Sequence, residues 1–110
     1  MIYVDNKADA SRTDLSIGDT LDPLFVYTAG TIYIDNSQPE CGLVACTAVE
    51  EASIRTAALA TTVKTDIVDA DSVSFAGASI DVGNEVIVGN AQQDAVANSV
   101  LAVVFRVQMQ

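Results

Sequence analysis

The chain has 110 residues, the length of a single domain with one core. Fifteen acidic against five basic residues give a formal net charge of −10 at pH 7. The five cations are scattered, whereas phosphate binding needs clustered Lys or Arg, so we expect no nucleic acid partner. A basic or mixed protein surface suits this charge better, and simple solubility is the alternative explanation. We expect no membrane partner, because no apolar run approaches the roughly 18 residues of a membrane span.

The residue types needed for common catalytic sites are missing. The chain has no His, which excludes Ser-His-Asp and Cys-His nucleophile activation and the commonest zinc ligand. Two carboxylate pairs, Glu50 with Glu51 and Asp69 with Asp71, lie in polar stretches typical of solvated turns. The second pair fails the calcium-loop pattern, which would need Gly at Ser74 and Glu at Ile80, so only a loose surface calcium site stays open. We expect no catalytic residue, no cofactor and no resident metal, and predict that the protein is not an enzyme.

The two cysteines, Cys41 and Cys46, are five residues apart. On one extended strand this separation is roughly 16 Å, beyond what a disulfide allows. Two thiols alone also cannot complete a tetrahedral metal site. We therefore expect both to be small buried side chains of a protein made in the cytoplasm.

Residues 1–20 combine a short apolar tip with a polar stretch of mixed charge. Ile2, Tyr3 and Val4 begin the chain as a strand-like segment, and residues 5–20 lack strong periodicity. We predict an N-terminal arm whose tip, Ile2, Tyr3 and Val4, binds a partner by adding a strand to its sheet. An ordinary edge strand of the same domain is the alternative.

The segment 24–49 is predicted to be a β-meander. Phe25 and Tyr27 in one half, and Ile32 and Ile34 in the other, recur with a period of two, and Gly30 separates the halves where a tight reversal needs positive φ. Residues 35–39 indicate a loop, and residues 42–49 a third, more apolar strand.

The remainder also has mostly strand patterns. We favour a strand across most of residues 53–68, with a helix at 54–60 as the alternative. Further strands are expected at 73–75 and at 85–88, the latter bracketed by Gly83 and Gly89. Residues 100–109 indicate a strand buried on both faces, with alternation returning near Arg106. We therefore predict an all-β fold, a small β-barrel or sandwich of about seven or eight short strands, with residues 1–20 as the arm and 21–110 as the domain.

The order of these segments resembles that of the small head decoration (cement) proteins of tailed bacteriophages. The resemblance rests on the apolar strand pair at 24–35 and GLVA at 42–45 followed by an acidic turn. It continues with the Ala- and Leu-rich stretch at 57–68, IDVGNEV at 80–86 and the Val-rich C-terminal strand. These cover about three quarters of the chain and include no diagnostic motif.

The resemblance implies a structural virion protein on the capsid exterior, made in the host cytoplasm. Its partner would be the major capsid protein, whose neighbouring subunits it would clamp against internal pressure, often as a trimer. The small side chains of residues 100–104 also favour a homo-oligomer, because a domain of this size struggles to cover such apolar surface. Two other classes stay open: a head-fibre or tail subunit, and a small β-barrel binding module, against which stands the shortage of aromatic residues.

Overall fold

The computed structural model describes residues 1–110 and contains eight strands in three antiparallel sheets, with one helix. The all-β prediction is confirmed; the sheets do not close into a barrel, and a sandwich fits their arrangement. No helix is long and apolar enough to cross a membrane. In chain order the elements are β1 (Ile2–Asn6), β2 (Ile17–Thr20), β3 (Phe25–Tyr27), β4 (Tyr33–Pro39), α1 (Ala48–Leu59), β5 (Val73–Ala76), β6 (Ser79–Val82), β7 (Ser99–Val104) and β8 (Val107–Met109).

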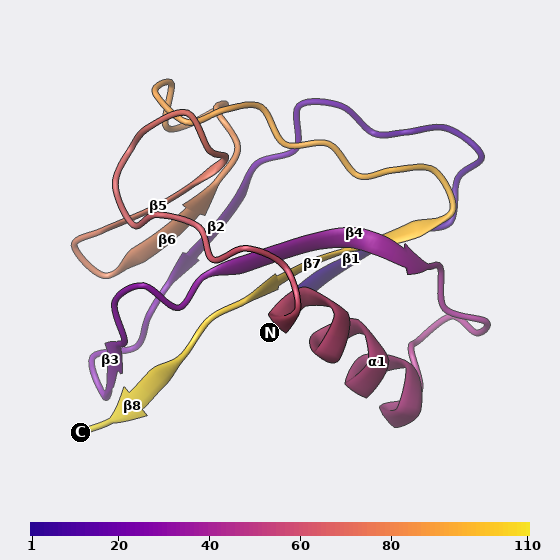
Figure 1. Ribbon diagram of the computed structural model, residues 1–110, viewed down its shortest axis with the longest axis horizontal. Helices are drawn as coiled ribbons and strands as arrows, with labels where there is room; N and C mark the ends of the chain where they lie inside the picture. Colours follow the sequence, from indigo (N-terminus) through magenta and orange to yellow (C-terminus); the bar gives the residue numbers. More distant parts are fainter.

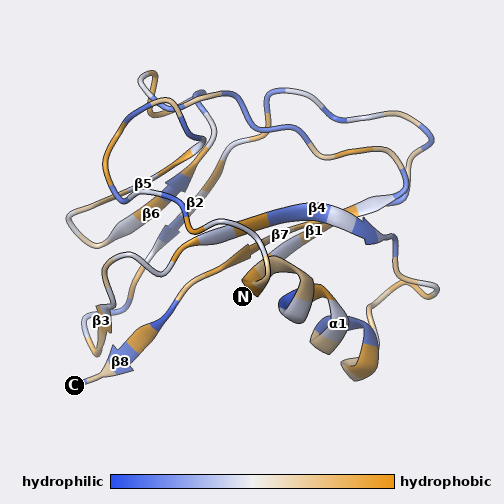
Figure 2. Cartoon of the chain, in the orientation of Figure 1, coloured by the Kyte–Doolittle hydropathy of each residue, from blue (hydrophilic) through white to orange (hydrophobic).

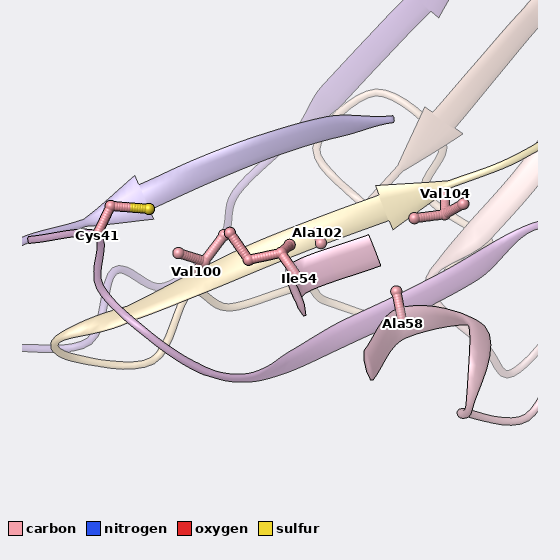
Figure 3. Close-up of a cluster of buried hydrophobic side chains, with 6 residues drawn as sticks. All are labelled: Cys41, Ile54, Ala58, Val100, Ala102 and Val104. Carbon is pink, nitrogen blue, oxygen red and sulfur yellow. The ribbon is translucent and has the colours of Figure 1, made fainter. Parts of the chain in front are cut away.

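Strand β7 is the centre of the structure. It lies between β1 and β4 in the first sheet, and every residue from Ser99 to Val104 is buried. Successive side chains of a strand point to opposite faces. Val100, Ala102 and Val104 accordingly join one core cluster with the helix residues Ile54 and Ala58 (Figure 3). The strand predicted over residues 100–109 is therefore buried on both faces only as far as Val104, and residues 107–109 form the separate, exposed strand β8.

The opposite face of β7 packs against the second sheet, whose strand order is β2-β6-β5. Val103 joins Val73, Ile80 and Val82 of that sheet in a second core cluster, together with Ile32. The molecule therefore has three layers, with α1, the β1-β7-β4 sheet and the β2-β6-β5 sheet in that order (Figure 1). This burial removes the reason for expecting an oligomer through residues 100–104.

Beside the second sheet, the backbone after β6 passes so close to the backbone before β2 that only glycine fits at the contact. Gly83 follows β6 with φ of +87°, and a Cβ added there would lie 2.1 Å from the carbonyl oxygen of Leu15. Its N–H donates to the Ser72 carbonyl at 2.7 Å. The expected strand at residues 85–88 is not formed. Gly83 therefore permits a backbone contact rather than bracketing a strand.

The predicted meander is wrong in its pairing. Gly30 has the expected positive φ of 70°, but β3 pairs with β8, and β4 pairs with β7. Residues 35–39, predicted as a loop, instead continue β4, whose register shifts between Asp35 and Gln38. Asn36 explains how a polar segment is kept in the sheet, because its side chain donates to the Asp94 carbonyl and accepts from Val96 N–H. Figure 2 shows the hydrophilic residues along β4.

The strands predicted at 42–49 and 53–68 are also wrong, since α1 occupies residues 48–59. Thr47 is its N-cap and forms a capping box with Glu50, which satisfies N–H groups that the first turn leaves free. Only Ile54 and Ala58 of the helix are buried. With two buried positions the helix has no continuous apolar stripe, so its periodicity was weak in the sequence.

Residues 1–20 are built into the fold along most of their length, as in the edge-strand alternative. Strand β1 pairs with β7, and β2 pairs with β6. Between them, Arg12 and Ala95 exchange backbone hydrogen bonds of 2.9 Å. The buried Asn6 side chain donates to the carbonyls of Ala10, Ala95 and Val96. These contacts pair residues 1–20 with strands and loops of residues 21–110.

Candidate functional site

A disulfide-closed loop between β4 and α1 is the most distinctive surface feature. Cys41 and Cys46 are bonded, with their Cα atoms 5.1 Å apart, so the expectation of two free thiols is wrong. That expectation assumed an extended strand, whereas residues 42–45 bend and bring the two ends together. Cys41 is buried in the core cluster beneath α1, so the loop (residues 41–46, hereafter the disulfide loop) is fixed to the interior at its base.

The end of β1 holds one side of the disulfide loop. The Cys41 N–H donates to Asp5 Oδ1 at 3.2 Å, and Lys7 Nζ donates to the Cys41 carbonyl. Asp5 Oδ2 accepts no hydrogen bond, but Lys7 Nζ lies 3.0 Å away and neutralises its charge. Both backbone polar groups of Cys41 are therefore bound by side chains from β1 and the residue following it.

The start of α1 fixes the other side of the disulfide loop. Glu50 accepts from the N–H of Gly42 at 2.9 Å through one oxygen, and from the N–H of Thr47 at 2.7 Å through the other. The hydrogen bond from Gly42, followed by that from Thr47, lowers the pKa of Glu50. One carboxylate thus caps the helix and fixes the loop that precedes it.

The tip of the disulfide loop projects apolar side chains into solvent. Leu43 is 67% exposed and Val44 is 99% exposed. A covalent closure, side-chain hydrogen bonds to Cys41 and Gly42 at the start of the loop and one to Thr47 just after its end restrict the loop before any partner arrives. Restricting a binding loop in advance reduces the entropy that binding costs. The arrangement is suited to inserting two apolar side chains into a hollow on another protein.

The predicted partner-binding residues lie in the strand whose end contacts this loop through Asp5. Ile2, Tyr3 and Val4 belong to β1, an edge strand, and each is partly buried. The Tyr3 hydroxyl donates to Glu51 Oε1 at 2.9 Å, and this hydrogen bond raises the pKa of Tyr3. The second edge of β1 has no strand neighbour. A partner role for these three residues stays a prediction, now as part of an edge strand.

Asp5, Cys41 and Cys46 bring three potential metal-ligand atoms within 4.8 Å of one another. In this structure the two sulfurs are bonded to each other, and the ammonium of Lys7 lies against the carboxylate. A disulfide provides no thiolate, and thiolate is the form of Cys that binds zinc. The cluster therefore acts as an anchor of the loop.

The two carboxylate pairs singled out in the sequence stabilise local structure through hydrogen bonds. Glu50 caps α1, and Glu51 accepts from Tyr3, so they serve different contacts. Asp69 accepts from the Thr65 hydroxyl, at 2.7 Å, and from the N–H of Asp71. The Thr65 hydrogen bond is the main cause of a lowered Asp69 pKa. Asp71 in turn accepts from the N–H groups of Thr65 and Val73, as a residue that stabilises a turn does.

The largest surface hollow lies along the outer side of α1. It is lined mainly by small side chains and contains no cluster of charged groups; its residues include Gln38, Ala48, Ala52, Thr56 and Ala60. Ligand sites usually combine an apolar enclosure with a few converging polar groups. The polar side chains that line this hollow, Gln38, Ser53 and Thr56, are all uncharged, and we assign no ligand to it.

Comparison of the chain with protein-family models, with curated proteins and with solved structures found no match.

Proposed function

We propose that this chain is a structural virion protein, a capsid decoration (cement) protein that binds the outer surface of a phage head and clamps neighbouring subunits of the major capsid protein. The observation that carries the proposal is the disulfide loop, which presents Leu43 and Val44 on a base fixed from two sides. A protein whose task is to hold another surface needs such an anchor and needs no catalytic cleft.

Charge around the disulfide loop defines the surface that would receive it. Glu40 and Glu50 lie at its base as acidic residues, whereas Asp5 is neutralised there by Lys7. Complementary charge favours association and excludes wrong partners. The capsid surface should therefore offer an apolar hollow for Leu43 and Val44, bordered by Lys or Arg.

The disulfide supports a site of action outside a reducing compartment. Disulfides persist on secreted proteins and virion surfaces, whereas cytosolic thiols are kept reduced. A protein made in the host cytoplasm would close the Cys41–Cys46 bond after release of the particle. A head-fibre or tail subunit remains the alternative within the virion, and a small binding module remains the alternative outside it.

The test combines fractionation with rebinding. An antibody raised against the purified chain is applied to the particle and soluble fractions of the source culture. Particles stripped of the chain are then mixed with wild type, with Val44→Asp, and with Val86→Asp as a matched control at another exposed valine. We expect the chain in the particle fraction, and rebinding by wild type and by the control but not by Val44→Asp.

The two parts of the proposal fail separately. A chain found only in the soluble fraction would overturn the virion function. A chain found on particles that rebind Val44→Asp as well as wild type would leave the virion function standing and remove the disulfide loop from it.

A further inference from the structure

The β3–β8 ribbon is a two-stranded sheet at one end of the molecule, with β8 at its outer side (Figure 1). Phe25 pairs with Met109, Val26 with Gln108, and Tyr27 with Val107. All residues from Arg106 to Gln110 are exposed. The ribbon packs on the second sheet through Tyr27, whose ring centroid lies 4.2 Å from that of Phe75, whereas the outer edge of β8 has no strand neighbour. A third strand at that edge would stabilise the ribbon further.

The hydrogen bonds of the ribbon show which edge of β8 is unused. Thr28 N–H donates to the Arg106 carbonyl, and Gln110 N–H donates to the Leu24 carbonyl, both at 2.9 Å. The even-numbered residues of β8 therefore face β3. Because hydrogen-bonding direction alternates along an antiparallel strand, the N–H and C=O groups of Val107 and Met109 point to the outer edge.

We propose that β8 pairs with β8 of a second copy of this chain around a two-fold axis. A two-fold axis through Gln108 places Val107 of one copy opposite Met109 of the other. This register aligns the outward groups of both copies and allows four backbone hydrogen bonds. A four-stranded sheet, β3-β8-β8-β3, results.

The same register joins the apolar faces of the two ribbons. Phe25, Tyr27, Val107 and Met109 lie on one face of the ribbon, because paired residues share a face and alternate residues return to it. In the dimer this face doubles in width, although Tyr27 is already packed against Phe75 of its own chain. Such an area of large apolar side chains is what cross-strand packing requires.

Charge identifies a second copy as the occupant. The side chains of the molecule carry −10, yet residues 24–28 and 105–110 contain no Asp or Glu, and their one charged side chain is Arg106. Two copies can therefore meet at β8 without opposing side-chain carboxylates, which most other surfaces of this acidic chain would bring together. The two-fold register favours a dimer rather than the trimer expected from the sequence.

The inference is independent of the proposed function, and it is tested on the purified chain in solution. Sedimentation equilibrium up to millimolar concentration is measured for wild type, for Met109→Pro and Met109→Asp, and for Val88→Asp as the control. Met109 is 77% exposed and Val88 86% exposed, so the two Asp substitutions are matched in exposure and charge. Pro removes the outward N–H of Met109 and none that faces β3.

We expect the average mass of wild type and of Val88→Asp to rise from 11.5 kDa toward twice that value. Met109→Pro loses two of the four hydrogen bonds, so it should dimerise about thirtyfold more weakly, and Met109→Asp should stay monomeric. In wild type, hydrogen exchange at the amides of Val107 and Met109 should slow as concentration rises. The inference would be overturned if wild type stays monomeric at every concentration, or if both Met109 variants associate as strongly as wild type.

Discussion

The Tyr3 hydroxyl donates a hydrogen bond to Glu51 Oε1 at 2.9 Å, joining the first strand to the first turn of the only helix. The two residues are 48 positions apart, so this contact closes the β1 side of the first core cluster against α1. It also explains why residues predicted to extend toward a partner are partly buried against their own chain.

Deletion of residues 1–6 should therefore cost the protein its native fold. The deletion removes the edge strand that covers one side of β7 and the buried Asn6, whose side chain makes three hydrogen bonds. Tyr3→Phe, which removes one hydrogen bond, should lower the free energy of unfolding by about 1 kcal/mol. Circular dichroism and urea titration measure both effects. A deleted chain with the midpoint of wild type would restore the detached-arm hypothesis.

Reduction of the disulfide should lower stability without abolishing the fold. In the chain-entropy model, a loop of six residues stabilises by about 2 kcal/mol. Urea titration of wild type with and without reductant measures the loss, and the Cys41→Ala, Cys46→Ser double variant serves as a control that reductant should not affect. Identical midpoints for oxidised and reduced wild type would contradict the role given to the disulfide loop.

Two glycines with positive φ should respond very differently to alanine. Gly30 (φ +70°) has open space around an added Cβ, whereas at Gly83 (φ +87°) the Cβ would overlap the Leu15 carbonyl oxygen. Gly30→Ala should cost about 1 kcal/mol, the price of a left-handed backbone alone. Gly83→Ala should cost about 3 kcal/mol or more, because the clash is added. Thermal unfolding of the two variants measures how much stability each one loses. Equal losses would contradict the close contact between Gly83 and Leu15.

The Glu50 capping box should make stability depend on pH in the acid range. Its pKa is lowered from 4.5 in the folded state, so its contribution is present above that value and is lost as pH falls through the lower folded pKa. Glu50→Gln should therefore unfold at a lower temperature than wild type at neutral pH, with the difference disappearing in acid. Glu85→Gln, at an exposed carboxylate, is the control and should show no such pH dependence. If the difference in unfolding temperature between Glu50→Gln and wild type persists unchanged in acid, the role given to the Glu50 carboxylate is wrong.

The parts of the fold that the sequence predicted correctly are those governed by local pattern. The apolar run of β7 indicated burial on both faces, and the start of the chain indicated β1. Which strands pair was not predictable from turns, because β3 and β4 both pair with strands near the C-terminus. Such contacts depend on how the whole chain packs, and neither hairpin signals nor periodicity encode them.

The disulfide loop was missed through an error about α1. The β-branched residues Val49, Ile54 and Thr56 are typical of strands, and two buried helix positions give little helical periodicity. A usable signal was present: Thr47 followed three residues later by Glu50 is a capping box. With the helix start placed there, residues 41–46 become a turn, and the distance argument against a disulfide no longer applies.

The most direct test of the proposed capsid decoration function is an electron cryomicroscopy map of the native particle. We expect density for this chain on the outer surface of the capsid, with Leu43 and Val44 directed into an apolar hollow of the capsid protein. The proposed capsid function would be contradicted by a map whose outer surface carries no density for this chain, if the same particle preparation also lacks the chain.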